Sequence, residues 1–208
     1  MEKVKLTKGG TVNLTKRYSG EKKFRIGLGW DLKGGRDADL DALVVELGAN
    51  GKVIDIDHLV GYPSGDTGRS NYRNITFTTP DGKVGFKDPE DCVKHFGDAR
   101  SALVSDADDE VIEIDLSRVN SGVNELLIIV SIYDSGISFK EVGFPSVSVY
   151  KGDSDISDLS YSLDESFPDC TVVEVAKIKK EGDSWVLEAL GNGSEGLDAE
   201  LQKYGIPC

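Results

Sequence analysis

Short apolar or alternating runs, separated by clusters of Gly, Asn, Asp and Pro, follow one another along the first two-thirds of the 208-residue chain. Runs of this kind, bounded by turn residues, are typical of β-strands, whose side chains alternate between two faces. The pattern therefore predicts an all-β, antiparallel protein. The expected strands are Val4–Leu6, Thr11–Leu14, Phe24–Leu28, Ala42–Leu47, Lys52–Asp57, Ile75–Thr78, Val111–Leu116, Leu126–Tyr133, Val147–Tyr150, Ser160–Leu163, Thr171–Lys179 and Trp185–Ala189.

Two segments have a more specific expected place. The run LLIIVSIY at 126–133 is the most apolar in the chain, so we expect it at the centre of a sheet with both faces covered. A short amphipathic helix is predicted at Glu195–Tyr204, because apolar residues recur there at spacings of four and three. Ser194 is its expected N-cap, and Gly205 and Pro207 follow as stop signals. This helix is expected to cover one edge or end of the sheets.

The Asn-Gly pair at 50–51 is the strongest local turn signal, since a type I′ hairpin turn needs positive φ at both central residues. A two-residue turn there predicts that Leu47 pairs with Ile54 and Val45 with Ile56. The apolar residues of this hairpin then share one face, which we expect to be the core. These residues are Leu43, Val45, Leu47, Ile54 and Ile56.

The same alternation predicts that the side chains of Asp41 and Asp39 point to this inward face, at the edge of the core where the strand begins. The opposite face of the hairpin is predicted to face solvent, with Val44, Glu46, Asp55 and Asp57. Two inward carboxylates are desolvated at a cost and repel each other unless a cation or several donors compensate. The position of these aspartates therefore raises the question of a bound cation.

Length and charge restrict the classes of protein. A chain of 208 residues is typical of one large β domain, so we expect residues 1–208 to form a single domain. Asp and Glu number 37 against 24 Lys and Arg, which gives a net charge of -13. Nucleic-acid binding depends on Lys and Arg that neutralise phosphates, so this charge argues against DNA or RNA as a partner.

The chain also lacks the usual signals for membrane insertion, secretion and zinc binding. No apolar run approaches the ~18 residues of a membrane-spanning helix, and the N-terminal MEKVKLTKGG has no apolar signal core. Cys92, Cys170 and Cys208 are an odd number without C-x-x-C spacing, which favours reduced thiols. We therefore expect a cytoplasmic protein that is not itself transmembrane.

Acidic residues gather next to several predicted strands. They occur in GWDLKGGRDADLD at 29–41, in GDAR at 97–100, in SDADDE at 105–110, and at the end of the central strand. If the two hairpins that these segments flank are stacked the same way up, the aspartates meet at one pole of the molecule. The aspartates concerned are Asp31, Asp39, Asp41, Asp98, Asp106, Asp109 and Asp134.

Calcium is the ion that such a pole suits, because it takes ~6–8 oxygen ligands in tolerant geometry. Magnesium favours fewer carboxylates, and zinc or copper would need His or Cys at ligand spacing. The D-x-D-x-D run at 37–41 imitates an EF-hand, but Ala42 and Gly48 stand where that loop needs Gly and Glu. Each acidic cluster alone is typical of a solvated turn, whereas their combination at strand ends favours a metal site.

Several motifs, in this order, resemble the tellurium-resistance TerD family of bacterial stress proteins. They are GLGWD at 27–31, DLDA at 39–42, GANGKV at 48–53, VKHFGDAR at 93–100, DADDEVIEIDL at 106–116, IYD at 132–134, SFKEV at 138–142 and the closing WVLEALGNGSEGL. No single motif is specific, but their combination spans nearly the whole chain. One departure falls in the acidic part, where similar proteins read GDNRTG and this chain reads GDARSA, with Ala99 and Ala102.

The resemblance implies a cytoplasmic two-sheet β-sandwich that binds calcium, with two ions expected, and has no established catalysis. It also implies a role in tellurite resistance, stress and phage defence, together with other proteins of that system and a membrane-bound partner. The family's acidic ligand positions fall on Asp31, Asp39, Asp41, Asp98, Asp106, Asp108, Asp109, Glu110 and Asp134.

Three functional hypotheses compete at this point. The leading one is a non-enzymatic protein whose calcium ions order acidic loops for a partner. The alternative is a calcium-dependent adaptor that binds an anionic membrane surface, which Lys33 and Arg36 favour and the net charge opposes. An enzyme is disfavoured, because G-x-S-x-G, P-loop and HExxH motifs are absent from the sequence. His95 is interpreted as a packed or capping residue, with Arg100 bonding to the acidic segments.

Overall fold

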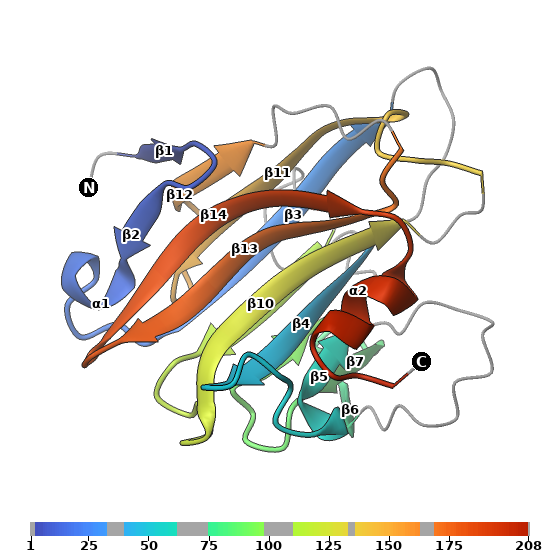
Figure 1. The fold of residues 1–208 in the computed structure, drawn as a ribbon. Helices are drawn as coiled ribbons and strands as arrows, with labels where there is room; N and C mark the ends of the chain where they lie inside the picture. Colours follow the sequence, from blue (N-terminus) through green and yellow to red (C-terminus); the bar gives the residue numbers. More distant parts are fainter. Residues whose placement is uncertain are drawn as a thin grey trace.

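The computed structural model describes residues 3–32, 40–61, 75–97, 110–132, 136–162 and 169–207. Two β-sheets lie face to face (Figure 1). The eight-stranded sheet has the order β1 (Val4–Leu6), β12 (Ser157–Ser162), β11 (Val142–Lys151), β3 (Lys23–Leu32), β9 (Glu110–Asp115), β8 (Val93–His95), β7 (Val84–Lys87) and β6 (Ile75–Thr78). The six-stranded sheet has the order β2 (Thr11–Asn13), β14 (Ser184–Ser194), β13 (Val172–Glu181), β10 (Val123–Ile132), β4 (Leu40–Gly48) and β5 (Leu59–Gly61).

The predicted antiparallel sandwich is confirmed. Among the described strands, β1 and β12 form a parallel pair, and the other recorded pairings are antiparallel. Three short helices complete the described part: α1 (Leu14–Arg17), the 3₁₀ turn η2 (Ile56–His58) and α2 (Leu197–Lys203). None of the helices in this part of the chain is long and apolar enough to cross a lipid bilayer.

The most apolar strand, β10, lies at the centre of its sheet as predicted, between β13 and β4. Leu126 and Ile128 belong to the core between the sheets, whereas Leu127 and Ile129 belong to a second apolar cluster on the outer face. Helix α2 lies over this outer face, as Figure 1 shows, and contributes Leu201 to the second cluster. Both faces of the strand are therefore covered, which explains its continuous run of apolar residues.

The prediction for the face of β4 was wrong in part. The residues buried between the sheets are Leu40, Ala42 and Val44, whereas Leu43, Val45 and Leu47 lie on the outer face under α2. Asp41 shares this outer face by alternation, and it is buried, with 4% of its surface exposed. Val44 and Glu46 were predicted to face solvent, but both are fully buried. The strand alternates between two cores instead of between core and solvent.

The hairpin after β4 also differs from the prediction. The N–H of Gly48 donates to the carbonyl oxygen of Lys52 at 2.8 Å, and Leu47 forms a bridge with Val53 instead of Ile54. No strand forms at Lys52–Asp57, because the side chain of Asp55 accepts the N–H of Asp57 at 2.9 Å and caps the start of η2. The neighbour of β4 is instead β5, with Leu59 opposite Val45, where Ile56 was predicted.

The predicted C-terminal helix is confirmed, but it begins at Leu197 and not at Glu195. It spans Leu197–Lys203, and its N-cap is Gly196, not Ser194. Ser194 is the last residue of β14, where Thr171 donates its N–H to the Ser194 carbonyl oxygen at 3.1 Å. Gly196 has a φ of +84°, a conformation that L side chains rarely adopt, and this lets the chain turn from strand to helix.

Candidate metal centre

Four strands meet at one end of the sandwich, where β3 and β10 end and β4 and β9 begin. Leu28 of β3 pairs with Glu110, the first residue of β9, in the eight-stranded sheet. Leu40, the first residue of β4, pairs with Ile132, the last residue of β10, in the six-stranded sheet. We call this end, defined by Leu28, Leu40, Glu110 and Ile132, the acidic end. The strand directions predicted from the sequence are confirmed here, but the two predicted hairpins are not, because β3 and β9 pair in one sheet and β4 and β10 pair in the other.

Most of the predicted ligand residues adjoin these strand ends in sequence but lie outside the described residues. They are Asp39, Asp98, Asp106, Asp108, Asp109 and Asp134. Arg100, predicted to bond to the acidic segments, also lies outside them. The backbone of Asp31 is described and pairs with Gly143 in β11, whereas its side chain is not. Asp41 and Glu110 are the predicted ligands whose side chains are placed.

Glu110 connects the two sheets at the acidic end. Its side chain is buried, with 2% of its surface exposed, and its Oε2 accepts the backbone N–H of Ala42 at 2.6 Å. The other oxygen, Oε1, is buried without a hydrogen-bond partner among the described residues. A buried carboxylate oxygen without a donor is costly, and a cation is one group that relieves this cost. The residues present therefore fit a cation at this end.

Asp41 lies one residue before Ala42 and belongs to the outer face of the six-stranded sheet. Its backbone pairs with Ser131 of β10, and both residues are buried. Asp41 and Glu110 are thus anchored in different sheets at the same end of the sandwich, where the hydrogen bond from the Ala42 N–H to Glu110 joins their strands and the side chain of Asp41 lies on the outer face. Among the described residues, no group of three or more His, Cys, Asp or Glu side chains is arranged to hold a metal ion. A complete ligand set would therefore need some of the residues outside that part.

The imidazole of His95 is an additional component that sequence reasoning placed only as a packed residue. It is fully buried, and its Nδ1 accepts the N–H of Gly97 at 2.9 Å, which confirms the packed interpretation. Its Nε2 lies 3.5 Å from Oε2 of Glu110 and has no hydrogen-bond partner among the described residues. The contact follows from the sheet pairing, because β8 and β9 are neighbours and His95 pairs with Ile112, two residues from Glu110.

A second buried carboxyl group lies near the other end of β4. Glu46 is fully buried, and neither of its carboxylate oxygens has a hydrogen-bond partner among the described residues. Burial, and then the negative charges of Asp88, Glu90 and Asp55, raise the pKa of Glu46 to about 9. The carboxyl group therefore holds a proton at pH 7, which removes the need for a counter-ion.

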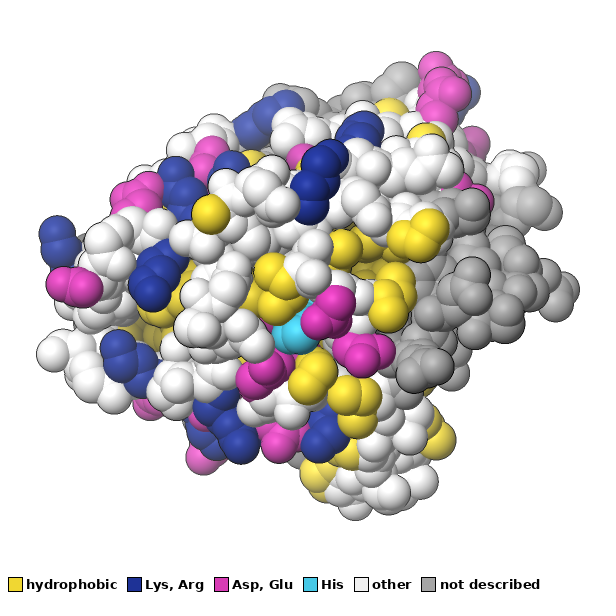
Figure 2. All heavy atoms as spheres, turned by 60° about the horizontal axis from the view of Figure 1, so that its bottom comes forward, with side chains coloured by type: hydrophobic (Ala, Val, Ile, Leu, Met, Phe, Trp, Pro, Cys, Tyr) yellow, Lys and Arg dark blue, Asp and Glu magenta, His cyan; other side chains and the backbone are white. Residues whose placement is uncertain are grey.

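His58 contacts two of the acidic residues that surround Glu46, namely Asp55 and Glu90. Figure 2 shows a histidine side chain among acidic side chains on the face that it draws. The Nδ1 of His58 lies 2.7 Å from Asp55 Oδ1, and its Nε2 lies 3.1 Å from Glu90 Oε2. Asn120 donates to the other oxygen of Glu90 at 2.5 Å. Because both imidazole nitrogens contact carboxylates, this histidine ties η2 to Glu90 and is poorly placed to bind a metal. Asp55 itself is exposed, as predicted.

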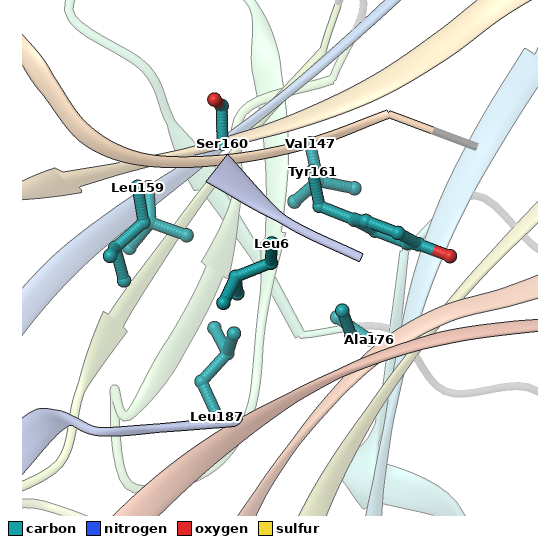
Figure 3. A pocket seen from close by; sticks show the side chains of 9 residues that line it. Leu6, Val147, Leu159, Ser160, Tyr161, Ala176 and Leu187 are labelled. Atoms are coloured by element: carbon teal, nitrogen blue, oxygen red, sulfur yellow. The ribbon is translucent and has the colours of Figure 1, made fainter. Parts of the chain in front are cut away.

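The sandwich also has an apolar cavity between the sheets, near β1 (Figure 3). Its empty space is about 220 Å³, a volume that includes open solvent. The lining is mostly aliphatic, with Leu6, Leu159, Ala176 and Leu187 among its residues. Ligand pockets combine apolar walls with a few convergent polar groups, so we interpret this cavity as a gap in packing.

The fold and the acidic end define a class of β-sandwich proteins with buried carboxylates where the two sheets meet. Similarity to known proteins identifies the family. The sequence model of the TerD domain matches residues 2–204. The tellurium resistance protein TerD of Serratia marcescens is 32% identical over 98% of this chain and 97% of its own length. General stress protein 16U of Bacillus subtilis is 26% identical over 98% of this chain and 97% of its own length.

The solved structures agree on the fold. A crystal structure of a homologue of telluride resistance protein (TerD) from Streptomyces coelicolor covers 85% of this chain and 92% of its own, with a TM-score of 0.55 and 16% identity. A crystal structure of a protein of unknown function covers 86% of this chain and 94% of its own, with a TM-score of 0.58 and 17% identity. The chain belongs to the TerD domain family, whose members include tellurium-resistance and stress-response proteins.

Proposed function

We propose that this protein binds calcium ions at the acidic end and acts, without catalysis, in tellurium resistance and the stress response. One observation carries the calcium part of the proposal: Oε1 of Glu110 is buried where the two sheets meet and has no hydrogen-bond partner among the described residues. The names of the relatives support the second part, because they describe resistance and stress proteins and not a reaction.

The donor set favours calcium over other ions. The ligands we propose are carboxylates, from Asp31, Asp39, Asp41, Asp98, Asp106, Asp108, Asp109, Glu110 and Asp134, and they are enough for two ions. Calcium accepts many carboxylate oxygens in irregular geometry, whereas magnesium demands a near-ideal octahedron and keeps several waters. The two histidines of the chain do not add ligands in this proposal, since His58 contacts two carboxylates and His95 faces Glu110.

The mechanism follows from the repulsion among these groups. A bound calcium ion would supply the positive charge that offsets the repulsion of neighbouring carboxylates. Asp41 and Glu110 are held by strands of different sheets, so they present a fixed pair of anchors to the segments that carry the remaining ligands. We propose that these segments adopt one arrangement with calcium and that a partner binds to it. Removal of calcium would restore the repulsion and release the partner.

We propose cytoplasmic partners from the same resistance and stress system, including a membrane-bound one. The net charge of -13 argues against nucleic acid as the partner. Sedimentation with vesicles that contain phosphatidylserine, in calcium and in chelator, separates this proposal from the membrane adaptor. Calcium-dependent binding to such vesicles would favour the adaptor.

Isothermal titration calorimetry of chelator-treated protein tests the calcium site directly. We expect two calcium ions per chain and weaker binding of magnesium under the same conditions. Glu110→Gln should weaken calcium binding, whereas Glu113→Gln, on the same strand but paired with Arg25 and Lys94, should not. A wild-type protein that does not bind calcium, or equal binding by both variants, would contradict the proposal.

A further inference from the structure

We propose that His95 is a positioning residue of the calcium site, which acts by holding the Glu110 carboxylate so that Oε1 faces the ion. This inference rests on the proposed function. It depends on the geometry of three groups: the backbone N–H of Gly97, the imidazole of His95 and the carboxylate of Glu110.

The hydrogen bond to Gly97 fixes the tautomer of the imidazole. Because Nδ1 accepts the N–H of Gly97 at 2.9 Å, Nδ1 carries no proton, and the proton of the neutral ring is on Nε2. Nε2 lies 3.5 Å from Oε2 of Glu110 and has no hydrogen-bond acceptor among the described residues. A small shift of the carboxylate on ion binding would turn this contact into a hydrogen bond.

The ring itself has little freedom to move. His95 is fully buried in β8, where its backbone pairs with Phe86 on one side and Ile112 on the other. The Phe86 ring lies 6.3 Å from the imidazole, centroid to centroid, at an angle of 53°. The orientation of the Nε2–H is therefore set by the eight-stranded sheet, before any ion is present.

One hydrogen-bond donor and one nearby N–H group thus face the same oxygen of Glu110. The N–H of Ala42 comes from the six-stranded sheet at 2.6 Å, and the Nε2–H of His95 comes from the eight-stranded sheet. With Oε2 held in this way, the rotation of the carboxylate is restricted and Oε1 is the oxygen left for the ion. A neutral imidazole suits this role because it accepts at one nitrogen and donates at the other.

The same three groups lie next to three proposed ligand positions. Ala42 follows Asp41, Gly97 precedes Asp98, and Glu110 is itself a ligand candidate. A change at His95 should therefore disturb the ion site although His95 is not a ligand. Partners of metal ligands typically contribute 10–100-fold to metal affinity.

Two substitutions separate the two nitrogens of the ring. His95→Asn keeps an acceptor near the position of Nδ1 for the Gly97 N–H but removes the donor that faces Glu110. His95→Gln keeps a donor that reaches toward Glu110 but removes the acceptor. In calorimetric titrations with calcium, we expect His95→Asn to lower affinity 10–100-fold and His95→Gln to lower it much less.

The control is His58→Asn, because His58 is the other buried histidine and contacts Asp55 and Glu90 far along β4 from Asp41. It should leave calcium affinity unchanged. A second readout needs no calcium: hydrogen exchange of the Ala42 amide, which donates to Glu110, should be faster in His95→Asn than in His95→Gln. If His95→Asn does not fold, calcium affinity and Ala42 exchange are compared among His95→Gln, Glu110→Gln and the variant that carries both of these changes.

The double variant tests whether His95 acts through Glu110. In Glu110→Gln, a further change at His95 should have no additional effect on calcium affinity, because the group it positions has been replaced. Calcium binding by His95→Asn equal to wild type, or additive losses in the double variant, would overturn the positioning role alone. A wild-type protein that binds no calcium would overturn the proposed function and this inference together.

Discussion

Asp41 and Glu46 lie on opposite faces of the same strand, and both carboxyl groups are buried. Asp41 belongs to the outer face with Leu43, whereas Glu46 follows Val44 and Ala42 into the space between the sheets. The two environments differ in what they can bind. Asp41 lies one residue from the hydrogen bond that joins the sheets, and Glu46 lies among other acids without a hydrogen-bond donor in the described chain.

Glu46→Gln should stabilise the protein at neutral pH. The pKa of Glu46 is about 9 in the folded state and about 4.5 for an exposed carboxyl, so between these values the folded state keeps a proton that the unfolded state releases. The free energy of unfolding therefore falls as pH rises through this window, by up to roughly 3 kcal/mol at pH 7. The variant has no proton to release at this position, so its free energy of unfolding does not fall with pH in this way.

Urea unfolding of wild type and Glu46→Gln at pH 5 and pH 8 measures this effect. We expect the variant to gain stability relative to wild type at pH 8 and little at pH 5. Glu181→Gln, at an exposed carboxylate of the β13–β14 hairpin, is the control for the removal of one charge. A difference between Glu46→Gln and wild type that does not change with pH would contradict the raised pKa.

Tyr204→Phe should loosen the attachment of α2. The hydroxyl of Tyr204 donates to Oε1 of Glu174, whose Oε2 accepts from Asn192 at 2.9 Å. The ring would keep its packing, but Oε1 of Glu174 would lose its donor in a buried environment, at a cost of about 1–3 kcal/mol. Urea unfolding monitored by circular dichroism gives this difference. Unchanged stability would show that water or another donor replaces the hydroxyl.

Asp41→Ala should weaken calcium binding far more than Asp57→Ala. Asp41 is the second residue of β4, at the acidic end, whereas Asp57 lies in η2 beyond the other end of that strand. Equilibrium dialysis with calcium compares the two variants at the same charge change. Equal losses would mean that binding depends on the overall negative charge and not on a site at the acidic end.

Alternation along the strands predicted the fold but could not decide which layer each face of β4 meets. A strand that is covered on both faces typically has a continuous run of apolar residues. Glu46 interrupts that run in β4, so the face with Glu46 and Val44 was predicted to meet solvent, although both residues are buried. The Asn-Gly pair predicted the turn, and Gly51 has a φ of +69°. It did not predict the longer connection, residues 48–52, that pairs Leu47 with Val53. Register at this point depends on the cap at Asp55, which local turn statistics do not include.

The location of the candidate site was predictable from the sequence, whereas the contact between His95 and Glu110 was not. Strand directions predicted that the strands flanking the acidic segments begin or end at one end of the molecule, and the pairing of Leu28 with Glu110 and of Leu40 with Ile132 confirms this for the strands. The contact of His95 with Glu110 was not predicted, because the two residues are 15 positions apart and meet only through the pairing of β8 and β9. The ligand roles themselves stay predictions.

The most direct test of the calcium site is a thermal melt after chelation, followed by addition of calcium or magnesium. An ion at 100 times its dissociation constant stabilises a folded protein by about 2.7 kcal/mol if the unfolded chain does not bind it. For a chain of this length, that corresponds to a rise in Tm of roughly 5–10 °C. We expect this rise with calcium and a much smaller one with magnesium. An unchanged Tm with calcium, or the same rise with both ions, would contradict a calcium site at the acidic end.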